Sequence, residues 1–205
     1  MSNSELNTEQ IILEAAEAEF FEKGFAGTKM MAIAKRANVA HSMLHYYFRS
    51  KENLFQTIFL KKAHTLYPLF ENVIDQKLPF SETVRILMKT QFNFLMQNPR
   101  LSQFILSEIL TNKENRALLL NVLYLKEVNP LTKLEELFNE ETKKGTIRPI
   151  AFQNLVMNIF SLNVFTFLAL PIVQDVITQN PEHIEKMMAE RCESNIQFVL
   201  TALRP

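Results

Sequence analysis

The side chains best suited to chemistry in this sequence lie in a short run that starts at position 41. His41, Ser42 and His45 can each donate or accept a hydrogen bond, and Met43 adds a soft apolar group between them. Across 23–51 the charged residues are all Lys or Arg, with no Asp or Glu among them. Hydrogen-bonding groups in a positive field suit a polyanion whose base edges and phosphates require both kinds of contact. The pattern therefore predicts a surface for duplex DNA.

Two short helices joined by a tight turn are the elements that must position these side chains. Small and apolar residues recur at helical spacing from Ile33 to Ala37, which lets a second helix approach closely. Asn38 follows them, and Asn tolerates the left-handed backbone that a sharp turn needs. A second helix is expected over 40–48, and Ser50 should cap a third one. This arrangement is a helix-turn-helix, whose second helix enters the major groove of DNA.

The stretch 28–55 is compatible with two other interpretations. One is a structural three-helix unit whose basic residues are ordinary solvated charges. Another is a metal pair, because His41 and His45 are four residues apart, but no third ligand or nearby carboxylate accompanies them. The chain has only three glycines, which excludes the Gly-rich phosphate loops of nucleotide enzymes, and it shows no nucleophile motif. We therefore expect no catalytic site, no metal and no cofactor.

The region from Thr8 to Phe55 resembles the N-terminal domain of TetR-family transcriptional regulators. The resemblance is dense and ordered, and it covers about the first quarter of the chain. The residues that carry it are Ile12-Leu13-Glu14-Ala15-Ala16, Phe20, Gly24-Phe25, Thr28, Ile33-Ala34, Ala37-Asn38-Val39, Leu44, Tyr46-Tyr47-Phe48 and Ser50-Lys51-Glu52-Asn53-Leu54-Phe55. Three positions depart from the usual pattern: His45 replaces a Tyr, Ala40 a hydroxyl cap and Asn38 a Gly.

The resemblance implies a ligand-responsive transcriptional regulator, usually a repressor, and not an enzyme. Such a protein is an all-helical homodimer that binds a palindromic operator and leaves it when a small hydrophobic molecule enters the C-terminal domain. Lys51, at the start of a helix, is expected to clamp a phosphate together with free backbone N–H groups. The family's DNA contacts carry over to Thr28, Lys29, His41, Ser42, Met43, His45, Tyr46 and Lys51.

The rest of the chain also reads as helices, so the expected fold class is all-α. No strand-like alternation persists in it. Gly24 should end the first helix, since glycine favours that position. The expected domains are a helix-turn-helix DNA-binding domain at 1–55 and a helical effector-binding and dimerisation domain at 56–205. Later helices are expected over 81–97, 100–110, 113–144 with an interruption near Asn129-Pro130, 152–178, and after Pro181.

The segment 152–178 is long and apolar enough to span a bilayer. Its recurring Asn, Ser and Thr residues, with Pro171, count against a membrane span, and a helix hydrophobic nearly all round can equally be buried in a protein core, so no membrane partner is expected. Excess apolar surface on this helix and the last one predicts a four-helix bundle that joins two chains. The single cysteine, Cys192, excludes an intramolecular disulfide and fits a cytoplasmic protein.

Phenylalanine and methionine are abundant, with 17 Phe and 9 Met, and many lie in the middle helices. Plain core packing is one explanation, and an apolar cavity for a small hydrophobic effector is the other. The residues proposed for such a cavity are Met88, Phe92, Met96, Phe104, Tyr124, Phe160 and Asn163. A second class of function also stays open: a helical module that binds a hydrophobe or lipid without operator-specific DNA binding.

Overall fold

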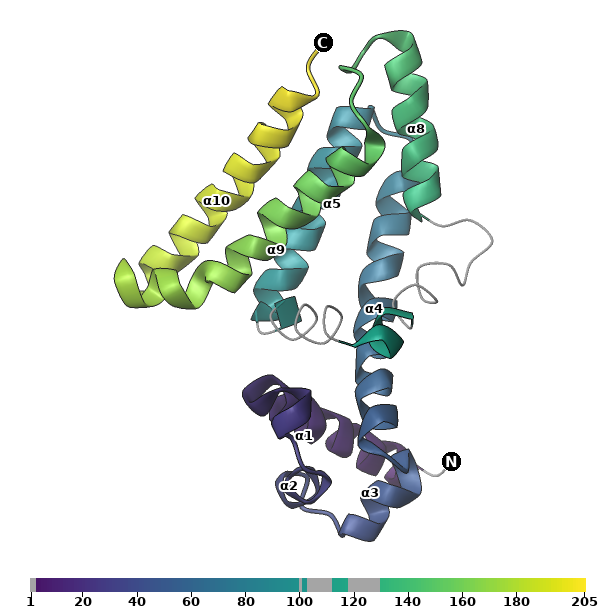
Figure 1. Ribbon diagram of the computed structural model, residues 1–205, viewed down its shortest axis with the longest axis vertical. Coiled ribbons are helices and arrows are strands. Elements are labelled where there is room, and N and C mark those ends of the chain that lie inside the picture. The colour runs from purple at the N-terminus through teal and green to yellow at the C-terminus, as the bar shows by residue number, and fades with distance from the viewer. Residues whose placement is uncertain (1–2, 100, 103–111, 118–129) are drawn as a thin grey trace. The chain divides into compact units, whose positions relative to one another are not determined.

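The computed structural model describes residues 3–99, 101–102, 112–117 and 130–205, and within these ranges the chain is helical with no strand. The described residues form two compact units, described separately below. One contains the described residues up to 65 together with 112–117, and the other contains the rest. The all-α prediction is confirmed. The functional boundary expected between residues 55 and 56 stays a prediction. The helices are α1 Asn3–Gly27, α2 Met30–Arg36, α3 His41–Phe48, α4 Lys51–Asp75, α5 Phe80–Gln97, α8 Pro130–Lys144, α9 Phe152–Val176 and α10 Pro181–Ala202 (Figure 1).

The first unit is built around apolar side chains that meet where α1 packs against α2 and α2 packs against α3. Ile12, Phe20, Ile33 and Leu44 are each at most 1% exposed. Rings also pack closely here: the Phe20 ring centroid lies 5.7 Å from that of Phe55, in an edge-to-face arrangement. Such pairs add to the stability gained from burial alone. The inward-facing side chains of α3 are held in this core. The opposite side of α3 remains exposed and available for binding.

Gly24 interrupts α1, as the sequence predicts. Its backbone has φ 68° and ψ 171°, a region that is populated almost only by glycine. The hydroxyl of Thr28 satisfies the backbone at this break, because Oγ1 donates to the carbonyls of Gly24 at 2.8 Å and Glu19 at 3.1 Å. The first helix therefore runs from Asn3 and breaks at the expected glycine.

Replacing Gly24 with alanine should lower the free energy of unfolding by about 1–3 kcal/mol. No atom lies within 4 Å of the added Cβ, so the loss would come from backbone strain and not from a clash. Gly27→Ala is the matched control, since Gly27 lies in the same helix without a positive φ. Urea denaturation of both variants measures the difference, and equal effects of the two changes would contradict this explanation.

The turn of the helix-turn-helix has the geometry that its residues predict. Asn38 adopts a left-handed backbone with φ 53°, between the end of α2 and the start of α3. Ser50 caps α4, because its Oγ accepts a hydrogen bond from the backbone N–H of Asn53 at 3.1 Å. Ala40, by contrast, gives α3 no side-chain cap. Asn38 in the turn and Ser50 as the helix cap therefore have the roles predicted from the sequence.

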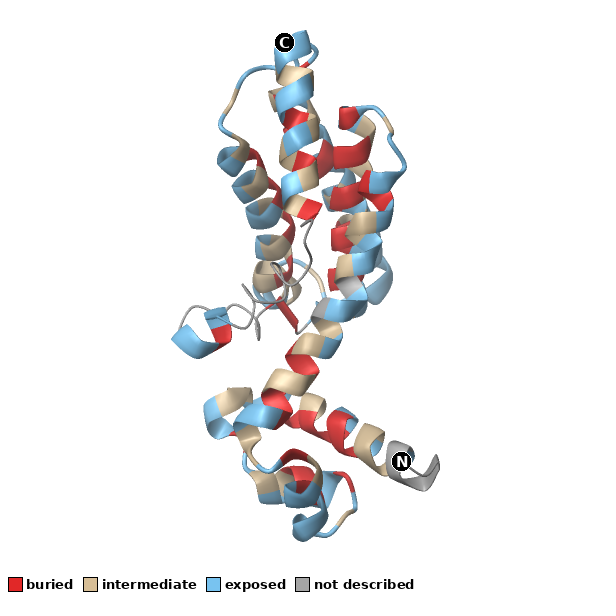
Figure 2. Ribbon diagram, turned by 90° about the vertical axis from the view of Figure 1, so that its right-hand side faces the viewer, coloured by how far each residue is buried: buried red, intermediate tan, exposed pale blue. Residues whose placement is uncertain are grey.

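The second unit is a bundle in which α5 packs against α8, α9 and α10, and α9 packs against α10 (Figure 1). Buried residues line the inner faces of these helices, and exposed residues lie outside (Figure 2). Val84, Met88, Leu155 and Ile196 are among the most deeply buried side chains of its core. The helices expected over 81–97 and 152–178 and after Pro181 are present. The helix expected over 100–110, and most of 113–129, lies outside the described residues.

Helix α9 is long and apolar enough to cross a membrane by length and composition, and 11% of that stretch is buried. Within the single chain α9 buries one face and exposes the other, so it has the excess apolar surface expected from the sequence. Large apolar side chains of α9 and α10 are more than half exposed; they are Met157, Phe165, Ile172, Val176 and Phe198. Exposed apolar surface of this kind marks an interaction site.

Candidate functional site

Helix α3 presents one polar side to solvent and one apolar side to the core of the first unit. Leu44 and Phe48, four residues apart, are buried. Tyr46 is 74% exposed, and its hydroxyl is carried beyond the helix surface by its ring. The other exposed side chains of α3 are His41, Ser42, Met43 and His45. The five residues predicted to read DNA on this helix therefore form one accessible surface, which we call the α3 face.

His45 is held in a fixed orientation on the α3 face. Its Nδ1 lies 2.9 Å from the backbone carbonyl oxygen of Arg49. Because a carbonyl can only accept, Nδ1 must carry the hydrogen, which leaves Nε2 of the neutral ring as an acceptor. The His41 ring packs edge-on against it, with centroids 4.6 Å apart. His45 can thus accept from a base amino group in the major groove, such as that of adenine or cytosine.

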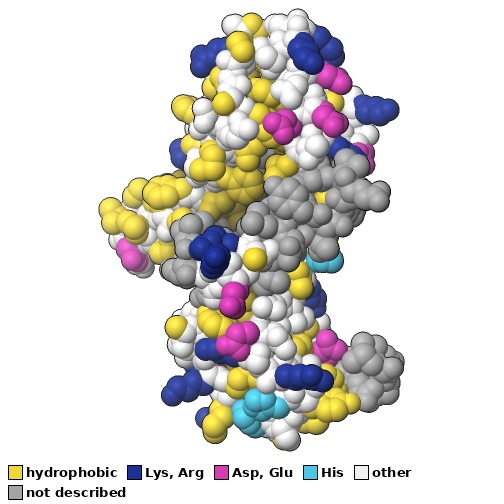
Figure 3. Space-filling view, turned by 45° about the vertical axis from the view of Figure 1, so that its right-hand side comes forward, with side chains coloured by type: hydrophobic (Ala, Val, Ile, Leu, Met, Phe, Trp, Pro, Cys, Tyr) yellow, Lys and Arg dark blue, Asp and Glu magenta, His cyan; other side chains and the backbone are white. Residues whose placement is uncertain are grey.

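The basic residues between positions 23 and 49 fall into two sets. Lys23 and Arg36 are paired with acidic residues of α1: Lys23 Nζ lies 2.6 Å from Glu19 and Arg36 2.7 Å from Glu22. The hydrogen bond that Arg36 donates to Glu22 raises the pKa of the guanidinium. Three exposed cations have no such partner in the described part of the chain: Lys29, Lys35 and Arg49. Figure 3 shows histidine side chains near Lys and Arg at the lower end of the molecule.

Thr28 and Lys51 use their polar groups inside the unit. Thr28 is 2% exposed, so its hydroxyl, bound to α1, is turned away from solvent. The ammonium group of Lys51 donates to the carbonyls of Phe25 at 2.8 Å and Thr28 at 3.1 Å, and it lies 4.4 Å from the centroid of the Phe25 ring. Lys51 thus ties the end of α1 to the start of α4. The DNA contacts expected of Thr28 and Lys51 stay predictions.

Lys51→Met should lower the free energy of unfolding by about 1.5–3 kcal/mol, the usual value for hydrogen bonds to a charged group. The methionine keeps the apolar stem and removes only the ammonium group that binds two carbonyls. Lys35→Met is the matched control, and it should change stability by less than about 0.5 kcal/mol because Lys35 is exposed. Thermal or urea denaturation measures both. A stable Lys51→Met protein would show that the two hydrogen bonds contribute nothing.

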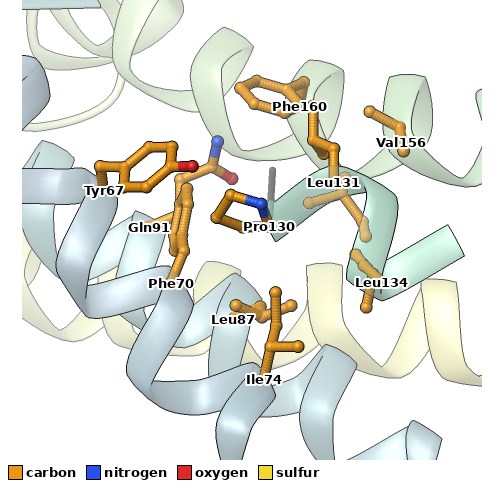
Figure 4. Close-up of a pocket in the computed structure, with 11 residues that line it drawn as sticks. Tyr67, Phe70, Ile74, Leu87, Gln91, Pro130, Leu131, Leu134, Val156 and Phe160 are labelled. Carbon is orange, nitrogen blue, oxygen red and sulfur yellow. The ribbon is translucent and has the colours of Figure 1, made fainter. Parts of the chain in front are cut away.

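The second unit contains an apolar cavity of about 200 Å³. Figure 4 shows its lining side chains, which come from α4, α5, α8 and α9. The eleven lining residues are Tyr67, Phe70, Ile74, Leu87, Gln91, Pro130, Leu131, Leu134, Val156, Ile159 and Phe160. An engineered cavity of about 150 Å³ with similar apolar walls binds benzene, so this one has room for a small hydrophobic molecule.

The cavity contains only part of the predicted set. Phe160 lines it, whereas Met88 and Asn163 are buried in the core beside it. Phe92 and Met96 line a different hollow, between α5 and α10. Phe104 and Tyr124 lie outside the described residues. The lining residues that were missed carry a periodic signal, since positions 67, 70 and 74 share one face of α4 and 87 and 91 one face of α5.

Within the described residues, no group of three or more His, Cys, Asp or Glu side chains could hold a metal ion. Cys192 on α10 is partly buried, and that burial raises the pKa of its thiol. A raised pKa leaves less of the nucleophilic thiolate at neutral pH.

Comparison with known proteins shows that part of the first unit matches a known family. Residues 12–58 match the family described as bacterial regulatory proteins, tetR family. Over 79 residues the chain is 33% identical to the uncharacterized HTH-type transcriptional regulator YhgD of Bacillus subtilis, a match that covers 38% of this chain and 41% of the relative. It is 27% identical over 84 residues to the fatty acid metabolism regulator protein of the same organism, covering 41% of this chain and 43% of that one. The chain thus spans less than half the length of these two relatives.

Solved structures share the whole fold. The haemolysin II transcriptional regulator HlyIIR superposes with a TM-score of 0.69 at 23% identity, over 98% of this chain and 99% of that one. The fatty acid degradation regulator FadR of Bacillus halodurans superposes with a TM-score of 0.71 at 20% identity, over 94% of each chain. The chain therefore shares the fold of these proteins, a helix-turn-helix domain followed by a helical C-terminal domain, and its residues 12–58 match the tetR family of bacterial regulatory proteins. Its relatives are transcriptional regulators and not enzymes.

Proposed function

We propose that this protein is a transcriptional repressor that binds operator DNA through the α3 face. The observation that carries this proposal is that five exposed side chains able to contact bases lie together on a helix anchored by two buried residues. Lys29, Lys35 and Arg49, which are exposed cations, are the candidates for phosphate contacts beside it. Because operator DNA is its partner, we assign it to the cytoplasm.

Salt dependence of DNA binding tests this assignment of roles. The logarithm of the affinity should fall linearly with the logarithm of salt concentration. Lys29→Ala should reduce the magnitude of that slope by about 1 and lower the affinity for every DNA sequence by the same factor. Fluorescence anisotropy of a labelled duplex, titrated at several salt concentrations, measures both effects. A change in base preference for Lys29→Ala would contradict its role as a phosphate contact.

We further propose that the exposed apolar side chains of α9 and α10 pair two chains across a two-fold axis. Covering Phe165, Ile172 and Phe198 in this way buries surface that a single chain leaves in water. Two heads could then read an inverted repeat in successive major grooves. Native mass spectrometry should show a mass of two chains, and Phe165→Asp with Phe198→Asp should shift it to one. A monomeric parent protein would contradict the pairing.

The effector in this proposal is a small hydrophobic molecule held in the cavity of the second unit. The cavity walls are almost entirely apolar, and two relatives are named as regulators of fatty acid metabolism or degradation. Binding of such a molecule is proposed to release the DNA. An anisotropy titration of the preformed DNA complex with extracted hydrophobic metabolites should therefore lower the signal.

A further inference from the structure

Three buried amide side chains connect the cavity to α10. Gln91 of α5, Asn163 of α9 and Asn195 of α10 are 4%, 1% and 1% exposed. The Nδ2 group of Asn163 donates to the Gln91 Oε1 at 3.0 Å, and its Oδ1 accepts from the Asn195 Nδ2 at 3.2 Å. We call this chain the amide relay. Buried amides without partners are costly, so each bond in the relay constrains the next.

Two backbone carbonyls fix the direction of the amide relay. Asn163 Nδ2 also donates to the Met88 carbonyl at 3.0 Å, and Asn195 Nδ2 donates to the Leu162 carbonyl at 3.1 Å. Since a carbonyl only accepts, neither asparagine amide can be reversed without placing two oxygens together. Both N–H groups of Asn163 are therefore used, and Gln91 must turn its oxygen toward Asn163.

As a result, the second polar group of Gln91, its Nε2 amide NH2, has no partner within the amide relay. Gln91 lines the cavity, and within the described part of the chain its Nε2 makes no hydrogen bond. Figure 4 shows its amide end directed toward the side of the cavity that carries Phe160. The relay thus offers a hydrogen-bond donor of fixed orientation to whatever fills the apolar cavity.

The charges of the residues that line the cavity further restrict the chemical class of the ligand. None of the eleven lining residues is Lys, Arg or His. An anion held against these described residues would lose hydration without meeting a cation among them, which is strongly unfavourable. A neutral oxygen such as that of a ketone, ester or amide needs only the donor that Gln91 provides.

We propose that Gln91 selects a neutral apolar effector that carries a hydrogen-bond-accepting carbonyl oxygen, in preference to a hydrocarbon or a free carboxylate. This inference rests on the proposed effector function of the cavity and adds the chemical class of the effector. The size of the cavity, somewhat larger than one that holds benzene, allows small aromatic probes to test it.

Isothermal titration calorimetry with three probes of similar size tests the proposal on the full-length protein. Acetophenone has the carbonyl, α-methylstyrene replaces its oxygen by CH₂, and benzoate carries a charge. Acetophenone should bind roughly tenfold more tightly than α-methylstyrene, the effect of one hydrogen bond, and more than about tenfold more tightly than benzoate. Gln91→Met should remove the preference over α-methylstyrene, whereas Gln97→Met, the same change at an exposed position of α5, should leave it intact.

The outcomes separate the inference from the proposed function. Equal binding of acetophenone and α-methylstyrene would overturn the role of Gln91 and leave the cavity as an effector site. Binding of none of the probes would overturn the effector site at this cavity, and the inference with it. If Gln91→Met fails to fold, the infrared carbonyl band of isotopically labelled acetophenone decides on the parent protein. The band of the bound probe should lie at lower frequency than in an alkane solvent, where the carbonyl has no hydrogen bond, and a band at the alkane frequency would contradict the hydrogen bond.

Discussion

Replacing His45 with alanine should weaken binding of a selected operator duplex by roughly 5- to 150-fold, the range expected for loss of one base contact. The His45 ring is oriented by its hydrogen bond to the Arg49 carbonyl, so its Nε2 is ready to accept from a base before DNA arrives. The change should also relax preference at one base pair in each half-site. Anisotropy titrations with single-base variants of the duplex measure both effects.

His64→Ala is the control for this prediction, because His64 is an exposed histidine of α4 outside the α3 face. It should bind the same duplex with unchanged affinity and unchanged base preference. Folding of His45→Ala is checked by circular dichroism, since its position is exposed and its removal leaves the core intact. A uniform loss of affinity across all base variants would mean that His45 contacts the backbone and not a base.

Asn163→Leu should lower the free energy of unfolding by roughly 3–5 kcal/mol, because it leaves several buried polar groups without partners. The Met88 carbonyl, the Gln91 Oε1 and one N–H of Asn195 all lose a hydrogen bond in this variant. Leucine has a similar volume, so the loss is not that of a cavity. Urea denaturation at one fixed protein concentration measures it.

Asn158→Leu provides the comparison, since Asn158 lies on the same helix but is exposed. It should change the stability by less than about 0.5 kcal/mol. Should the two variants unfold at the same urea concentration, the amide relay would not contribute to the stability of the second unit.

Local geometry was predictable where one residue determines it by its own chemistry. Gly24, Asn38 and Ser50 each act through the backbone of their immediate neighbours, and all three have their predicted roles. The apolar spacing of Leu44 and Phe48 likewise fixes which side of α3 faces out. The fold class and the composition of the α3 face follow from such short-range rules.

Long-range contacts are what the sequence could not provide. Lys51 reads as a surface cation, but its partners Phe25 and Thr28 lie more than twenty residues away in sequence. The cavity shows the same limit: helical spacing tells which side of α5 carries Leu87 and Gln91, but α4, α8 and α9 decide whether that side is filled or hollow. Met88 follows Leu87 directly in the sequence, yet it is buried in the core and does not line the cavity.

Selection of bound duplexes from a random pool tests the central claim most directly. The full-length protein is mixed with the pool at low salt, bound duplexes are amplified over several rounds, and the enriched sequences are read. A dimeric repressor should enrich an inverted repeat whose half-sites are spaced by about one helical turn or a multiple of it, because two α3 faces must enter major grooves on one side of the DNA. Enrichment of no sequence, or of a single unrepeated site, would contradict a dimeric operator-binding repressor.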